Sequence, residues 1–398
     1  MFPLVSLPDP RDYDVDFELG FVAARSTELP AYYAPWCNLL SHLPHLLEAE
    51  ALQAQVSNLE ILTTDHLTTS AHWQRAYVVL GFLTQAFIWQ DKRKPSQVVP
   101  ASLAEPFLEV CSYLGTEPVL SYVGLCLWNW MQRDEEIRSP PLLALADFRA
   151  IKSVASFTGT RDEDAFNLVP VMVEAQGAKL IRLMLDTIVA DQNGEILDLV
   201  SVLDVCVKTL TTMRETLSVL DRNCDPTFFF QKIRPMLGGS SGAEEKGLPN
   251  GVSFERSDGS RVVIKCVGGS AGQSSLFQLL DHMFGVRHES KMLLEMRAYM
   301  PKQHRDFLEA VELMPSLRDT IERRPEDKEL GCAFQGVLDA FQKWRTKHVS
   351  IVSRFVVLPA AAEAKGKPAE QQKGTAGSQP IPFLKQYRDE TVFKLQNQ

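Results

Sequence analysis

The chain has 398 residues, 45% of them hydrophobic and 23% charged, and its formal net charge at pH 7 is −9. This length predicts two domains or one large one. The negative charge argues against a nucleic-acid-binding protein, which needs a basic face. Because no run of about 18 or more apolar residues occurs, we expect no membrane-spanning segment.

The seven cysteines are scattered along the chain, and none of them forms a CxxC pair. This spacing argues against zinc ribbons, thioredoxin-like redox sites and iron–sulfur clusters. The N-terminal sequence MFPLVSLPDPRDYDVD does not show the basic segment and apolar run of a secretory signal. Free thiols without such a signal predict a cytoplasmic protein.

The first third of the chain predicts an extended arm followed by helices. Residues 1–30 show no periodicity, whereas helical segments follow one another over 32–132. Two of these segments are 35–50 and 72–90. The second is apolar nearly all round, which predicts a buried helix.

The helical pattern breaks at Pro140-Pro141 and then restarts. We therefore expect a small helical N-terminal domain over 1–145 and a large helical C-terminal domain over 146–398. Helical periodicity dominates both parts, so the sequence predicts an all-α protein.

The large domain begins with two predicted long helices, over 164–190 and 195–223. Pro170, in the first of them, removes an internal backbone hydrogen bond, so that helix either kinks or starts at this residue. A short aromatic helix is predicted over 228–237. Residues 238–259 hold many glycines among polar residues, which is typical of loops and turns.

Residues 260–266, SRVVIKC, are the best strand candidate, and a strand this brief does not change the class. The segment 268–275, GGSAGQSS, follows at once. It is either a flexible surface loop, a phosphate cradle, or a place where small residues let the backbone approach a bulky flat ligand. The phosphate cradle is disfavoured because no Lys follows the last glycine and the GxGxxG spacing is absent.

An amphipathic helix predicted over 331–358 has His348 at the centre of its apolar face. At about 100° per residue, large apolar side chains surround this histidine: Phe334, Val337, Phe341, Trp344, Val352 and Phe355. The opposite face carries Asp339, Lys343, Lys347 and Arg354. An unpaired buried imidazole costs about 1–3 kcal/mol. His348 is therefore either a core histidine bonded to a backbone carbonyl or an axial ligand of haem iron.

The C-terminal region predicts a lid. Helices are expected over 301–320, before the His348 helix, and again over 383–393. Between 359 and 382 the apolar content is low, which predicts a mobile loop. A mobile loop tethered at both ends by helices is a candidate lid.

Several catalytic motifs do not occur: HExxH, GxSxG, the P-loop and the EF-hand. The other histidines do not cluster with acids at metal-ligand spacing, so we interpret them as surface or core residues. They are His42, His45, His66, His72, His282, His288 and His304.

Together, several motifs resemble those of the indoleamine 2,3-dioxygenase family, haem-dependent enzymes that degrade tryptophan. The motifs are GGSAGQSS at 268–275, RAYMP at 297–301 with His304-Arg305, Arg345 with His348, Asp65-His66-Leu67-Thr68, Phe229-Phe230 with Arg234, and Lys373-Gly374-Thr375. The resemblance covers nearly the whole chain, and its specific parts are the glycine-serine motif and the histidine spacing.

The resemblance implies an all-helical protein whose large domain binds haem b. It implies that His348 is the proximal iron ligand and that Asp281 and Arg345 support the proximal side and the propionates. The residues implied at the haem edge and the substrate amine are Gly269, Ser270 and Ala271. Those implied for the substrate are the pocket wall of Tyr122, Phe166, Phe229, Phe230 and Leu237, the carboxylate partner Arg234 and the lid residue Thr375.

The implied reaction inserts both atoms of dioxygen across the indole C2–C3 bond of L-tryptophan, with other indoleamines as further candidates. The product is N-formylkynurenine, and the pathway is tryptophan catabolism. Partners are L-tryptophan, dioxygen and an unidentified reductant, and we expect a monomer. Such chemistry needs one strong axial ligand and one open iron position.

One position departs from the family pattern: many members carry a distal serine where this chain has Pro170. Any distal hydrogen bond must then come from water, the substrate ammonium or Ser270. An alternative is a non-catalytic or weakly active haem protein on the same fold, an oxygen carrier or sensor. Retention of Phe229, Arg234 and Thr375 argues against it, because a carrier has no use for a carboxylate clamp. A third interpretation is a helical scaffold without cofactor.

Overall fold

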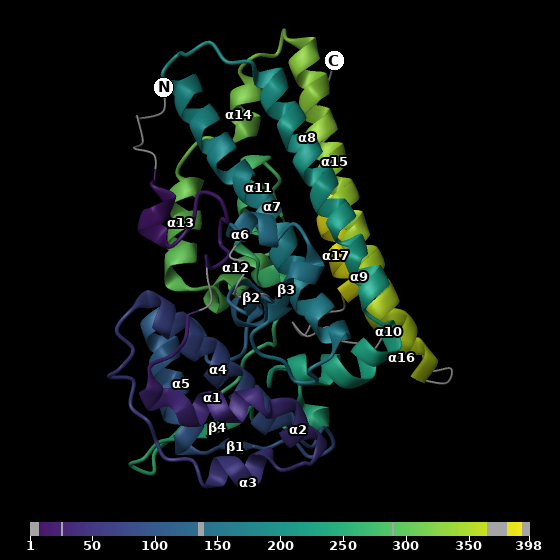
Figure 1. The fold of residues 1–398 in the computed structure, drawn as a ribbon. Coiled ribbons are helices and arrows are strands. Elements are labelled where there is room, and N and C mark those ends of the chain that lie inside the picture. Colours follow the sequence, from purple (N-terminus) through teal and green to yellow (C-terminus); the bar gives the residue numbers. More distant parts are fainter. Residues whose placement is uncertain (1–7, 25–26, 134–138, 289, 364–379, 392–398) are drawn as a thin grey trace.

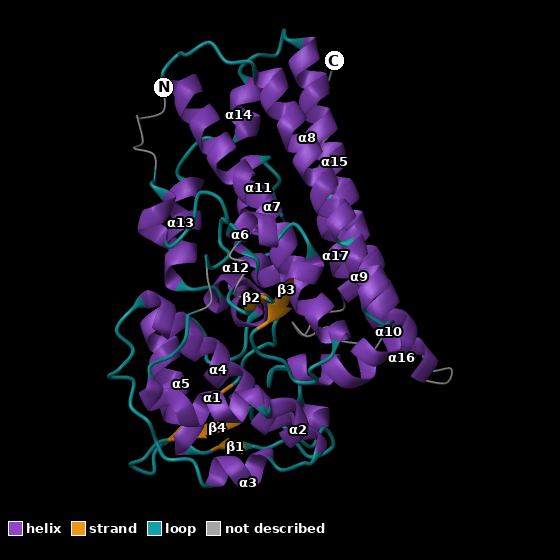
Figure 2. Ribbon diagram, in the orientation of Figure 1, coloured by secondary structure: helices purple, strands orange, loops and turns teal. Residues whose placement is uncertain are grey.

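The computed structural model describes residues 8–24, 27–133, 139–288, 290–363 and 380–391 (Figure 1). Within these ranges the regular structure is predominantly helical and the strands are short (Figure 2). The helices are α1 (Ala34–Ser41), α2 (Leu43–Glu48), α3 (Leu52–Ser57), α4 (Ser70–Trp89), α5 (Ala101–Leu114), α6 (Pro141–Ala144), α7 (Arg161–Gln192), α8 (Leu199–Thr216), α9 (Ser218–Asn223), α10 (Pro226–Phe228), α11 (Ser275–Met283), α12 (Met292–Met296), α13 (Lys302–Glu312), α14 (Leu317–Glu322), α15 (Lys328–Val352), α16 (Leu358–Glu363) and α17 (Pro380–Asp389). The strands are β1 (Val98–Val99), β2 (Trp130–Gln132), β3 (Ile151–Ser153), β4 (Val252–Glu255) and β5 (Arg261–Ile264). The predicted all-α class is confirmed. Among the described helices none is long and apolar enough to cross a membrane.

Helix α4 is the centre of the lower lobe in Figure 1, where α1, α3 and α5 pack against it. Thr69 caps its first turn, because the Thr69 hydroxyl accepts a hydrogen bond from the backbone N–H of His72 at 3.2 Å. Every residue from Ala76 to Trp89 is buried. A helix enclosed on all sides must be apolar all round, so the predicted buried helix at 72–90 is confirmed.

The predicted helix at 35–50 is instead two helices, α1 and α2. The first ends at Ser41, and Pro44 lies in the first turn of the second. A proline cannot donate to the carbonyl four residues earlier, so it interrupts a continuous helix. It is tolerated in a first turn because the N–H groups there have no partner within the helix.

Strand β4 lies inside 238–259, where the sequence predicted only loop, so that prediction is wrong for 252–255. Its alternate residues Val252 and Phe254 face the core, with 2% and 1% of their surface exposed. It pairs in parallel with β1 and antiparallel with β5, and β5 confirms the strand predicted over 260–266. Because this sheet joins segments from both sides of residue 145, the two-domain division stays a prediction.

Three long helices, α7, α8 and α15, pack side by side in the upper part of Figure 1. Helix α7 begins well before Pro170, at Arg161. Acidic residues at 162–164 favour this start, since they face the positive end of the helix dipole. The helix predicted over 195–223 is split into α8 and α9, and α8 starts late because Asp198 caps it.

The C-terminal region differs in part from the predicted mobile loop at 359–382. Residues 358–363 form α16, and residues 380–382 already belong to α17. The prediction of a loop is therefore wrong at these two ends. The centre of the segment, and with it Thr375, lies outside the described residues. Helix α17 confirms the helix predicted from residue 383 onward as far as Asp389.

Candidate active site

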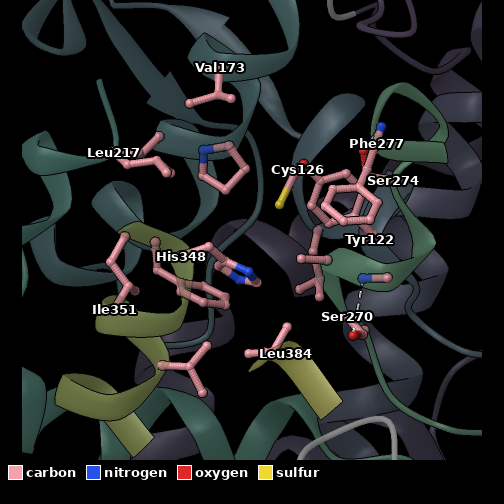
Figure 3. A pocket seen from close by; sticks show the side chains of 18 of the residues that line it. Tyr122, Cys126, Val173, Leu217, Ser270, Ser274, Phe277, His348, Ile351 and Leu384 are labelled. Atoms are coloured by element: carbon pink, nitrogen blue, oxygen red, sulfur yellow. Dashed lines mark hydrogen bonds between the residues drawn. The ribbon is translucent and has the colours of Figure 1, made fainter. Parts of the chain in front are cut away.

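A cavity of about 290 Å³ lies where the long helices meet the glycine-serine segment. This volume is near the lower end of the range typical of ligand sites, about 300–1,000 Å³. Most of its lining is apolar (Figure 3). Helix α7 contributes Phe166, Val169, Pro170, Val173 and Glu174; α15 contributes Trp344, Arg345, His348, Ile351 and Val352; the segment before α11 contributes Gly269, Ser270, Ala271, Gly272 and Ser274; and α17 contributes Leu384 and Tyr387.

The imidazole of His348 points into this cavity (Figure 3). Neither ring nitrogen has a hydrogen-bond partner among the residues that the structure describes, and the exposed part of the side chain faces the cavity. Burial lowers the pKa of His348 to about 4, so the ring is neutral at pH 7 and keeps a lone pair. The interpretation as a core histidine bonded to a backbone carbonyl therefore finds no support here.

A neutral, unpaired imidazole in a largely apolar cavity fits the proximal side of a haem. Cys126 also lines the cavity, but burial raises the pKa of its thiol strongly. A protonated thiol is a poor metal ligand. Among the described lining residues, His348 is therefore the side chain best suited to hold an iron.

The glycine-serine segment is fixed by Gln273, whose role the sequence analysis missed. The Gln273 side-chain oxygen accepts hydrogen bonds from the backbone N–H groups of Ser270 at 3.2 Å and Tyr122 at 2.9 Å. Its amide donates to the Gly268 carbonyl at 3.0 Å. The Ser270 hydroxyl accepts from the Gly272 N–H at 3.3 Å. The spacing Ser-x-x-Gln is that of a capping box, and this was the signal available in the sequence.

Gly268 and Gly269 are buried, so the segment is not a flexible surface loop. A Cβ on Gly268 would lie 2.0 Å from the Leu237 carbonyl oxygen, and one on Gly269 would lie 2.2 Å from Leu125 Cδ1. Both glycines therefore permit close approach of one chain segment to another. This close approach aligns 268–272 along the cavity.

Gly268→Ala tests that close approach. We expect the free energy of unfolding to fall by about 1–3 kcal/mol, because the added methyl group overlaps backbone atoms that cannot move aside easily. The matched control is Gly331→Ala in α15, where a Cβ would meet nothing within 4 Å. There the higher helix propensity of alanine should raise stability by up to about 1 kcal/mol. Urea denaturation measures both, and equal effects would contradict this account.

A buried carboxylic acid, Glu174, forms part of the cavity wall and was not predicted. Its Oε1 accepts hydrogen bonds from the hydroxyls of Tyr122 at 3.0 Å and Ser274 at 2.5 Å. Its Oε2 is buried without a partner in the described parts of the chain. Burial raises the pKa of Glu174 to about 7. The signal in the sequence was a single acid within the apolar stretch at 168–175, one turn after Pro170.

The pKa of Glu174 makes stability depend on pH. Between the ordinary value of 4.5 and about 7, the folded chain keeps a proton that the unfolded chain has lost. The free energy of unfolding therefore falls as pH rises through this window. In the haem-free chain, Glu174→Gln should reduce the loss between about pH 5 and pH 8 by about 3 kcal/mol, at about 1.4 kcal/mol per pKa unit.

Urea unfolding at the two pH values measures this difference. Glu309→Gln, on an exposed position of α13, is the control and should match the parent chain. An unchanged pH dependence in Glu174→Gln would show that this carboxyl does not titrate in the window.

The aromatic wall is formed by Phe166, Phe229 and Phe355. The Phe166 and Phe229 ring centroids lie 4.7 Å apart at an interplanar angle of 43°, and Phe355 lies edge-on to Phe229 at 5.8 Å. Phe230 does not line the cavity, contrary to the expectation. It lies against the Arg234 guanidinium, with the Cζ 5.1 Å from the ring centroid.

Arg234 lines the cavity. Burial lowers the pKa of Arg234, while the Glu363 charge opposes this shift. An arginine remains charged under such shifts. The cavity wall therefore carries a cation beside the aromatic rings, the arrangement expected of a carboxylate clamp.

Arg345 lines the cavity, whereas its ion-pair partner Asp281 lies behind it. Arg345 also donates to the Tyr387 carbonyl at 2.8 Å and to the Thr391 hydroxyl. Burial lowers the pKa of Arg345, and the Asp281 charge counteracts this. On its other side Asp281 contacts His288, which the sequence analysis interpreted as a surface or core residue.

Comparison with known proteins identifies the family of the chain. The family model described as indoleamine 2,3-dioxygenase matches residues 9–394. The chain belongs to the indoleamine 2,3-dioxygenase family. A 6-hydroxytryptophan 2,3-dioxygenase of Fusarium equiseti is 38% identical over 401 residues, covering 96% of this chain and 97% of the relative. An indoleamine 2,3-dioxygenase of Aspergillus nanangensis is 33% identical over 404 residues, covering 96% of each chain. Indoleamine 2,3-dioxygenase 2 of Homo sapiens is 31% identical over 398 residues, covering 96% of this chain and 94% of the relative.

This membership confirms the resemblance and supports an oxidoreductase of the haem-dependent dioxygenase type. The cavity brings together most of the residues expected at the family site: Tyr122, Phe166, Phe229, Arg234, Leu237, Gly269, Ser270, Ala271, Arg345 and His348. Phe230 and Asp281 lie outside the lining. The individual roles of all these residues remain predictions.

Proposed function

We propose that the chain is a haem dioxygenase that inserts both atoms of dioxygen across the indole C2–C3 bond of L-tryptophan or a close derivative, giving N-formylkynurenine or its derivative. The observation that carries the proposal is a neutral, unpaired His348 in the same cavity as the Arg234 cation. Membership of the indoleamine 2,3-dioxygenase family supports it.

Haem b would be held by His348, beside Gly269, Ser270 and Ala271. When bound, it supplies a ferrous iron for the activation of dioxygen. Arg345, paired with Asp281, is placed to meet a propionate as well, because a guanidinium can donate several hydrogen bonds at once. An unidentified electron donor would keep the iron reduced, and a monomer in the cytoplasm is our proposal for the working state.

The substrate would be held by the aromatic rings and by Arg234. Phe166 and Phe229 offer two tilted apolar faces that can orient an indole. Arg234 would bind the substrate carboxylate through paired, charge-assisted hydrogen bonds. The apolar lining would keep water away from the bound substrate. The residues of this chain would therefore orient the substrate and exclude water, and the proposed reaction requires no amino-acid general base.

The ring substituent of the substrate is a separate question. The relative from Fusarium equiseti is named for 6-hydroxytryptophan, and that from Aspergillus nanangensis for indoleamine. We propose L-tryptophan as the reference substrate, with ring-hydroxylated tryptophans as the first alternatives to compare.

A second candidate function, a non-catalytic oxygen carrier or sensor, is favoured by one observation. Pro170 lines the cavity on α7 and offers no hydrogen-bond donor. Of the hydroxyl groups on the described part of the cavity lining, those of Tyr122 and Ser274 already donate to Glu174. A carrier would form a stable oxygenated state with no product.

The product assay separates the two functions. Reduced, haem-loaded protein is given L-tryptophan or 6-hydroxytryptophan with dioxygen, and the formyl product is followed in the near ultraviolet and by mass spectrometry. We expect incorporation of both oxygen atoms. Arg234→Ala should lower kcat/KM by about 10–150-fold, the effect of about 1.5–3 kcal/mol for a hydrogen bond to a charged group. A stable oxygenated protein without product would favour the carrier.

His348→Ala tests the proposed iron ligand. We expect loss of stable haem binding, because the alternative donor Cys126 is a protonated thiol. Haem titration followed at the Soret band measures the affinity, and His282→Ala, on α11 outside the cavity lining, is the control. Unchanged spectrum and affinity in His348→Ala would disprove the assignment.

A further inference from the structure

His288 lies between two carboxylates that come from distant parts of the chain. Its Nε2 is 2.9 Å from Asp281 Oδ2, and its Nδ1 is 2.5 Å from Glu390 Oε2. The side chains are 10% exposed for His288, 7% for Asp281 and 16% for Glu390. The Tyr387 ring packs over the imidazole at 4.2 Å between centroids.

The imidazole of His288 is held from both sides. Each ring nitrogen lies within hydrogen-bond distance of a carboxylate oxygen, and Asp281 is also paired with Arg345. Charge-assisted hydrogen bonds with little solvent access are among the stronger contacts in proteins.

The cluster joins α17 to the rest of the molecule. Asp281 belongs to α11, Arg345 to α15, and Glu390 directly follows α17. Arg345 holds the same helix end through the Tyr387 carbonyl and the Thr391 hydroxyl. Asp281 therefore contacts two residues, His288 and Arg345, each of which also contacts the end of α17.

Helix α17 is also a wall of the cavity. Leu384 and Tyr387 belong to the lining, and Leu384 points into the cavity (Figure 3). A helix of 10 residues is marginal by itself in water. Its position must come from tertiary contacts, which include the packing of α17 against α15 and the contacts of His288 with Tyr387 and Glu390.

We propose that His288 is a positioning residue: clamped between Asp281 and Glu390, it holds α17 in place as a wall of the cavity. Loss of the clamp loosens α17 without removing any group that would touch haem or substrate. The effect on catalysis rests on the proposed function, whereas the effect on α17 does not.

The test compares full-length, haem-loaded variants. His288→Ala removes both hydrogen bonds, His288→Gln keeps one donor, and Glu390→Gln keeps the shape but removes one charge. The matched control is Asp389→Asn, next to Glu390. The Asp389 side chain is 60% exposed and pairs with Arg388, so this variant removes a carboxylate at the same helix end without touching His288. Each variant is examined by hydrogen exchange at 380–391, by the rate of haem transfer to an acceptor protein, and by KM and kcat for tryptophan.

We expect exchange at 380–391 to accelerate at least about tenfold in His288→Ala and less in His288→Gln, with Asp389→Asn equal to the parent. Haem loss should accelerate in the same order. The KM should rise while kcat changes little, as for a residue that acts on binding. A His288→Ala and Glu390→Gln double variant should be non-additive, because the two residues share one contact.

Unchanged exchange in His288→Ala would overturn the clamp, whatever the activity. Faster exchange with unchanged haem loss and KM would overturn the claim that α17 positions the cavity. If His288→Ala fails to fold, the same three measurements on Glu390→Gln decide: unchanged hydrogen exchange at 380–391 would overturn the clamp. A parent protein without dioxygenase activity would refute the proposed function, and the exchange and haem-loss data would still decide the clamp.

Discussion

The cavity is built around the neutral imidazole of His348, which has no hydrogen-bond partner among the described residues. Burial lowers the pKa of this ring to about 4, and an unpaired polar group in such a place costs about 1–3 kcal/mol. Binding of a ligand to the unpaired nitrogen would offset this free-energy cost. Helix α15, which carries this ring, is held in place by its packing against α8.

Around this ring, several polar groups of the cavity wall are hydrogen-bonded to one another, whereas Glu174 Oε2 has no partner among the described residues. Tyr122 and Ser274 donate to Glu174, Ser270 caps the turn after it, and Arg345 is paired with Asp281. A ligand therefore meets mainly carbon surfaces and the lone pair of His348. An apolar lining with one free imidazole is compatible with the haem that we propose as the cofactor.

The sequence predicted what local periodicity controls. His348 was found because a helix of 25 residues displays its apolar face clearly, and α4 was found because it is apolar all round. The break at Pro44 was predictable from proline chemistry alone. Strand β4 was missed because four residues among glycines carry almost no pattern. The contact between His288 and Glu390 joins residues 102 apart, and no local signal encodes such a distance.

The family resemblance predicted most of the residues that line the cavity, but it was wrong about Phe230 and it missed Glu174. Phe230 was expected in the wall beside Phe229, but neighbouring residues on a helical turn point in different directions, and only one of the two can face the cavity. Glu174 shows the converse case. Its position one turn after Pro170 puts it on the same side of α7, so the cavity wall that carries a proline at one turn carries a proton-binding group at the next.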